Sequence, residues 1–192
     1  MMIRPKGRKF AELILFISER SEGDARFSTG KLNRLLFYSD FGAYLQLGNS
    51  ITGEAYLKLP EGPSAHRFVE IRDKLVARGE LAIRQHERGC RNQDRTFALR
   101  SANVTDFTPD EIALVTKLVD QSWEYDAEFK GYYSNDSAHW EEDVPDFNKI
   151  PYEFALLSKR RPTKKERELC EKDVHRARAF FAIKREPAPS DA

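Results

Sequence analysis

Apolar residues near the start of the chain recur at the spacing of one helix face: Phe10, Leu13, Ile14 and Ile17. This pattern predicts a first helix over about residues 7–20. Residues 31–47 are apolar nearly all round, so they predict a second helix that lies buried at the centre of the fold. Either Ser28 or Thr29 can cap the N-terminus of this second helix.

The next segments switch from an extended to a helical pattern. Residues 55–59 alternate in polarity and predict a short strand, which the Pro- and Gly-rich residues 60–63 end. A third helix is expected over about residues 65–78. Ser64 would cap its N-terminus, and Gly79 would end it in a left-handed conformation.

Residues 81–99 predict a β-hairpin, because alternating positions flank a long polar tip at residues 86–95. With the preceding helix, the hairpin resembles the back half of a winged helix. In that interpretation four arginines of the hairpin reach DNA phosphates: Arg84, Arg88, Arg91 and Arg95. The acidic residues Glu80, Glu87 and Asp94 offset these charges, and a solvated hairpin is the alternative. We expect no measurable binding to duplex DNA at physiological salt.

The second half of the chain begins with a strong helix signal. Thr108 and Glu111 form a capping box around a proline at the first helical position, which predicts the start of a fourth helix. Residues 131–149 are polar and aromatic and predict irregular chain. A short helix is expected over 151–157, and a last helix after a second capping box over about 163–181.

Together these elements predict an α+β fold that is predominantly helical and partly winged-helix-like. It has about five to six helices and a small antiparallel sheet of one strand plus a β-hairpin. We expect one domain over residues 7–158, a C-terminal helical extension over 159–184 packed on it, and a mobile tail over 185–192.

Charge and cysteine content narrow the class of protein. The 192 residues include 32 Lys and Arg against 31 Asp and Glu, a net charge of +1 that excludes a dedicated polycation. Cys90 and Cys170 form no disulfide framework or Cys/His cluster, so we expect no metal site and no cofactor. The apolar run 13–17 is too short for a signal peptide or a membrane span. A cytoplasmic protein with no membrane partner is expected.

No recognisable catalytic set is present in the sequence. The STGK segment at 28–31 fails as a phosphate-binding loop, because Ala25 replaces the required glycine and Leu32 the required Ser or Thr. His139 beside Trp140 and the acidic run 141–143 is the one dense polar–aromatic cluster, and we interpret it as a surface loop, with an acid–base site as the alternative. We therefore predict no enzyme and no small-molecule substrate.

Asp40 is a carboxylate inside the most apolar helix, where it must be paired or hydrogen-bonded. We interpret it as a structural anchor that accepts hydrogen bonds from a neighbouring loop. The alternative is a general acid or base, for which no second catalytic group accompanies it.

Aromatic residues outside the periodic helix faces favour a protein-binding surface, since Tyr and Trp dominate interface hot spots. The predicted contact residues are Tyr56, Tyr132, Tyr133 and Trp140, with Arg88 and Arg91 as rim charges that tune the encounter rate. In the competing interpretation Trp140 folds back and fills the core between the fourth helix and the first. Trp123 is expected in the core from its helical spacing.

Two motifs resemble the Panacea antitoxin domain family, also called SocA-like. They are LNRLLFYSDF at 32–41 and SITGEAYLKLPEGP at 50–63. The residues that fit the family pattern are Lys31, Leu32, Leu35, Leu36, Asp40, Ser50, Ile51, Thr52, Gly53, Tyr56, Gly62 and Pro63. A later motif fits at Ser134, Trp140, Ile150 and Pro151, but Asn135 stands where the family has histidine. The resemblance covers about residues 8–158.

The resemblance implies an antitoxin that neutralises a cognate protein toxin of a bacterial or phage toxin–antitoxin system by direct contact. Members of the family are similar although their toxins are unrelated. The alternatives are a winged-helix-type DNA-binding regulator of its own operon and a hydrolase or transferase that uses Asp40 and His139. An adjacent toxin gene favours the first, and strongly salt-dependent DNA binding favours the second.

Overall fold

The fold is built around α2 (Thr29–Leu47), which begins where the sequence predicts a cap. The side chain of Ser28 accepts a hydrogen bond from the Lys31 amide at 3.3 Å, and Gly48 ends the helix in a left-handed conformation. The computed structural model describes residues 5–88, 91–123 and 139–156, together with the isolated positions 168, 172, 173 and 176. The chain divides into two units, Met1–Lys159 and Arg160–Ala192.

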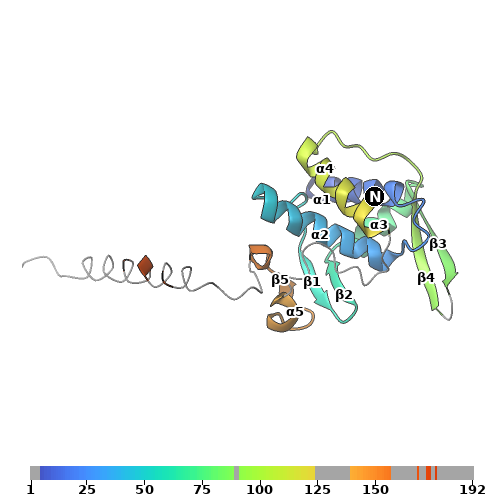
Figure 1. Cartoon of the computed structure of the whole chain (residues 1–192). Coiled ribbons are helices and arrows are strands. Elements are labelled where there is room, and N and C mark those ends of the chain that lie inside the picture. Colours follow the sequence, from blue (N-terminus) through green and yellow to red (C-terminus); the bar gives the residue numbers. More distant parts are fainter. Residues whose placement is uncertain are drawn as a thin grey trace, which may run out of the picture. The chain divides into compact units, whose positions relative to one another are not determined.

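Three helices pack together in the first unit (Figure 1). They are α1 (Pro5–Arg20), α2 and α4 (Pro109–Ser122), and each contacts the other two. The four residues that predicted α1 are all fully buried: Phe10, Leu13, Ile14 and Ile17. Their burial confirms the predicted inner face of α1.

The start of α4 confirms the predicted capping box. Thr108 accepts from the Glu111 amide, and Glu111 accepts from the Thr108 amide. The same carboxylate lies 2.9 Å from Nζ of Lys9 on α1, so the cap also ties two helices together.

The prediction that Trp123 lies in the core was wrong, because its side chain is 43% exposed. Its ring lies over Gly23, where an added Cβ atom would approach the ring to 2.9 Å.

One antiparallel sheet has the strand order β2–β1–β5. It consists of β1 (Tyr56–Leu59), β2 (Gly62–Ala65) and β5 (Lys149–Ile150). The prediction that the chain turns from a strand directly into a helix at Ser64 was wrong. Gly62–Ala65 is a strand, which tolerates Pro63 because β2 lies at the edge of the sheet.

The third helix consequently starts later than predicted. α3 spans Phe68–Ala77, and its N-cap residue, Arg67, makes no side-chain cap. Ser64 instead donates to the Asn33 side chain at 3.2 Å, which joins β2 to α2. Gly79 follows the helix with a φ of 68°, the left-handed conformation expected at its end.

The second sheet is the hairpin of β3 (Leu81–Arg88) and β4 (Arg91–Ala98), which directly follows α3. The predicted long tip was wrong, because the register continues to the pair Arg88–Arg91. Ladder hydrogen bonds join backbone groups, so polar residues do not interrupt them. Near the base, the Thr96 hydroxyl lies 3.0 Å from that of Ser18 and holds β4 against α1.

The segment expected to be irregular contains order in its second half. α5 (His139–Asp143) lies within it, β5 begins at its last residue, and the 3-10 helix η1 (Tyr152–Leu156) takes the place of the predicted short helix. The fold is α+β, as predicted, but the described residues hold four helices of ten residues or more, fewer than the five to six expected. Apart from the four isolated positions, the predicted C-terminal extension and tail lie outside the described residues.

Candidate partner-binding site

Asp40 lies on the side of α2 that faces β1 and is fully buried. Its Oδ1 accepts the Thr52 amide at 2.7 Å; its Oδ2 accepts the Thr52 hydroxyl at 2.5 Å and the Tyr56 hydroxyl at 2.7 Å. Burial raises the pKa of Asp40 to about 6, and the hydrogen bonds from Thr52 and Tyr56 partly oppose this rise. The carboxylate thus holds the 50–56 segment against α2, as an anchor would.

Tyr56 is 1% exposed, so the buried face of β1 carries this tyrosine. Its ring meets the rings of Phe37 and Phe41 edge-on, and its hydroxyl also lies 2.9 Å from the Leu36 carbonyl oxygen. Burial, followed by the charge of Asp40, raises the pKa of Tyr56 well above its ordinary value. As it lies here, Tyr56 has no free surface for a partner, and a contact with one stays a prediction.

Other polar residues extend this network to η1 and α3. The Tyr152 hydroxyl donates to the Glu54 carbonyl oxygen at 2.6 Å. The buried Glu54 carboxylate accepts Nε of Arg67 at 2.9 Å, in front of α3. Burial raises the pKa of Tyr152 far above its ordinary value, with the Asp40 charge adding to it. The network therefore links α2, the loop 50–55, α3 and η1 through hydroxyl groups and two buried carboxyl groups, those of Asp40 and Glu54.

The remaining motif residues have structural positions. Leu32 and Leu36 are fully buried on α2, and Pro63 is buried on β2. Gly53 and Gly62 have φ values of 66° and 121°, which side chains rarely adopt. Ser50 is half-buried before the Asp40-bound Thr52.

Lys31 forms a second buried polar centre that sequence reasoning missed. Its side chain is 1% exposed, and Nζ lies 2.5 Å from both Oδ2 of Asp24 and the Ser122 carbonyl oxygen. Asp24, 2% exposed, also accepts the Arg26 amide at 2.8 Å. The ammonium thus joins the start of α2, the loop after α1 and the end of α4. A lysine in the first turn of an apolar helix was the available signal.

Trp140 on α5 packs edge-on against Phe37, with ring centroids 5.5 Å apart, and is 8% exposed. The indole is therefore buried against α2, whereas the competing interpretation placed it between the fourth helix and the first. Tyr132 and Tyr133 lie outside the described residues, as does the His139 side chain. The structure therefore does not bring the four predicted aromatic contact residues onto one described surface.

The β3–β4 hairpin carries the predicted basic residues in facing positions. The register pairs Arg84 with Arg95 and Arg88 with Arg91, and these four positions share one face of the ribbon. The Arg95 guanidinium donates to the Glu22 carbonyl oxygen at 2.5 Å, while Arg84 is exposed. The side chains of Arg88 and Arg91 lie outside the described residues.

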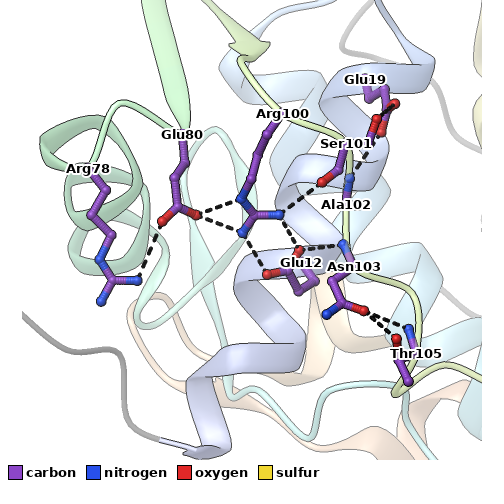
Figure 2. Close-up of polar contacts among 9 residues, drawn as sticks. All are labelled: Glu12, Glu19, Arg78, Glu80, Arg100, Ser101, Ala102, Asn103 and Thr105. Atoms are coloured by element: carbon purple, nitrogen blue, oxygen red, sulfur yellow. Dashed lines mark hydrogen bonds and ion pairs between the residues drawn. The ribbon is translucent and has the colours of Figure 1, made fainter.

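Arg100 forms a polar cluster that joins α1 to the chain before and after the β3–β4 hairpin, and sequence reasoning missed it (Figure 2). Its guanidinium lies between Glu12 of α1 and Glu80 before β3, with contacts of 2.7 Å to each. Burial by itself would raise the pKa of Glu12, but the Arg100 bonds and charge and the Asn103 amide hold it below its ordinary value. A recess of about 270 Å³ opens beside this cluster, with Ala11 and Leu75 in its wall.

The described part of the chain holds neither a cluster of metal-binding side chains nor a helix that could span a membrane. Within residues 5–88, 91–123 and 139–156, no three His, Cys, Asp or Glu side chains could together hold a metal ion. The described helices are also too short or too polar to span a bilayer.

Comparison with known proteins gives one family. The model of the family described as antitoxin SocA-like, Panacea domain, matches residues 32–143, which is more than half of the chain. This range includes the Asp40–Thr52–Tyr56 network, the β3–β4 hairpin and α4. No curated protein and no solved structure matches the chain.

Proposed function

Since this chain belongs to the SocA-like antitoxin family with a Panacea domain, we propose that it neutralises a protein toxin by direct binding. The toxin would be the partner encoded with it in a bacterial or phage toxin–antitoxin system. Neutralisation would take place in the cytoplasm and would require no catalytic step by this chain.

The observation that carries this proposal is the inward direction of the polar motif residues. Lys31, Asp40, Thr52 and Tyr56 each bind groups of this same chain. A motif whose polar groups bind other groups of the same chain defines a scaffold rather than a reaction centre. Such a scaffold suits a family whose members bind different partners, because the surface can vary while the interior holds the fold.

Within this proposal, Tyr132 and Tyr133 contact the toxin, and Arg88 and Arg91 form rim charges that raise the encounter rate. A contact of Tyr56 with the toxin stays a prediction, and Trp140 is buried against Phe37, where it supports the fold.

An enzymatic role for Asp40 is disfavoured by its position. The carboxylate is fully buried, and Thr52 and Tyr56 occupy its oxygen atoms. A general acid or base must come within hydrogen-bond reach of a substrate. We therefore assign Asp40 a structural role.

A DNA-binding regulator is the second candidate, and the facing arginine pairs of the hairpin favour it. A two-stranded ribbon fits the major groove of DNA, and arginines bind phosphates. On the neighbouring α3, however, the exposed Glu70 and Asp73 pair with Lys74 and Arg72, which leaves fewer cations to bind phosphates. We expect no duplex binding at physiological salt; submicromolar, strongly salt-dependent binding to the upstream DNA would promote this candidate, and Arg88→Ala and Arg91→Ala should then each weaken it.

The test of the antitoxin proposal uses the product of the adjacent gene. That protein alone should arrest growth of a bacterial host, and co-expression of this chain should restore growth. The two purified proteins should also form a complex in size-exclusion chromatography. Growth arrest that this chain does not relieve, with no complex formed, would reject the proposal.

A further inference from the structure

Phe147 stands in a conformation that its residue type disfavours. It lies in the turn Pro145–Asn148, which the Asn148 amide closes on the Pro145 carbonyl oxygen at 3.2 Å. Its φ is 65°, a left-handed value that no other non-glycine residue adopts within the described ranges. Glycine or asparagine suits such a position, whereas a bulky side chain costs free energy there.

The Phe147 ring also contributes little to the core. At 68% it has the largest exposed fraction of all the large apolar side chains in the described parts of the chain. The fold therefore holds an aromatic ring in solvent at the cost of backbone strain. Strain of this kind is concentrated at functional sites, where it positions a side chain in advance.

Lys58 of β1 keeps this turn in place. Its amide donates to the Asn148 carbonyl oxygen at 2.9 Å, and its carbonyl oxygen accepts the Phe147 amide at 2.7 Å. Its ammonium donates to the Glu141 and Val144 carbonyl oxygens at 2.6 and 2.8 Å and lies 3.3 Å from the Asp146 carboxylate. One lysine thus binds α5 and the turn to the central strand of the sheet.

From this geometry we propose that Phe147 is the anchor by which the chain binds its toxin. The inference rests on the proposed antitoxin function and locates its contact surface. A ring on a fixed backbone loses little conformational entropy when it enters a pocket, and buried aromatic residues dominate binding energy. The pocket on the toxin is apolar, because the exposed part of the anchor is a hydrocarbon ring.

The charges around the anchor define the rim of that pocket. Glu141, Asp143 and Asp146 are exposed in the same segment, against the single exposed cation Lys149 in the described residues 140–150. An acidic rim is complementary to lysine and arginine side chains on the partner. The partner is therefore a folded protein with an apolar pocket bordered by basic residues.

The test compares Phe147→Gly with wild type in binding to the purified product of the adjacent gene. Glycine relieves the strained φ, so the variant should keep or raise its melting temperature. Its affinity should nevertheless fall about 30-fold or more, as for a hot-spot residue. Asparagine also tolerates this conformation, so Phe147→Asn should show the same retained melting temperature and the same loss of affinity. Val69→Ala on α3 is the matched control, because Val69 is 55% exposed and should leave both measurements unchanged.

Two further measurements test the positioning and the charge. Lys58→Met keeps the aliphatic stem and loses the ammonium contacts, so affinity should fall while the Phe147 ring is still present. Wild-type affinity should weaken as salt is raised, because rim charges are screened.

The outcomes separate this inference from the proposed function. If wild type binds and Phe147→Gly binds within about threefold of it, the anchor is wrong and the antitoxin function stands. A lower melting temperature for both Phe147 variants, with affinity lost only in proportion, would make the ring structural and also reject the anchor. If wild type does not bind, both fail together.

Discussion

The hydroxyl of Tyr56 lies 2.7 Å from Oδ2 of Asp40, and both side chains are closed off from solvent. This contact joins the central helix α2 to the central strand β1. The pair also explains why a carboxylate is retained in the most apolar helix of the chain. Without the hydroxyl and amide donors of the 52–56 segment, the charge at Asp40 would be costly to bury.

Asp40→Ala should lower stability by about 1–3 kcal/mol, because the Tyr56 and Thr52 donors would be left without an acceptor in the interior. The measurement is the free energy of unfolding by urea. Asp106→Ala, at an exposed position, is the control and should change it little. An unchanged value for Asp40→Ala would show that the donors find other partners.

Stability should depend on pH through Asp40. Its pKa in the fold, about 6, lies above the ordinary value of 3.8, so the folded state binds a proton more readily than the unfolded state. This contribution is fully present below about pH 4 and is lost as pH rises through about 6. Between pH 7 and pH 5, wild type should gain about 1 kcal/mol relative to Asp40→Asn. Measuring both proteins at each pH cancels the titration of other carboxylates; a constant difference would contradict the shift.

Lys31→Met should be strongly destabilising, by about 3 kcal/mol or more, because Asp24 would keep a buried charge without its cation. The double variant Lys31→Met with Asp24→Asn removes that charge and should recover part of the loss. A thermodynamic double-mutant cycle measures the coupling. If the two single losses simply add, the ion pair does not carry the effect.

Trp140→Ala should lower stability by about 3 kcal/mol, because it empties a site packed against Phe37. Rescue from the toxin should then fall in step with the melting temperature.

Replacing Tyr132 and Tyr133 together by alanine should reduce rescue at an unchanged melting temperature, since they are proposed contacts. If rescue by the double variant falls only in proportion to its melting temperature, these tyrosines are not part of the contact surface.

Local signals in the sequence determined where α2 and α4 begin and which face of α1 is buried. Ser28 caps α2, and Thr108 with Glu111 caps α4, as their residue types predict. These signals hold because each involves groups within about four residues, whose geometry is independent of the rest of the chain. The family motifs could likewise be recognised from residue types alone.

The tertiary structure decided everything that depends on a distant partner. The alternating pattern of residues 55–59 does not determine which face of β1 is buried. Tyr56 is buried because its side chain packs against Asp40 and the aromatic residues of α2. Arg100 meets Glu12 of α1 only because the chain after β4 returns to that helix. The strained turn at Phe147 likewise requires Lys58, far away in sequence. Such contacts are set by which elements pack together, and no local pattern in the sequence encodes that choice.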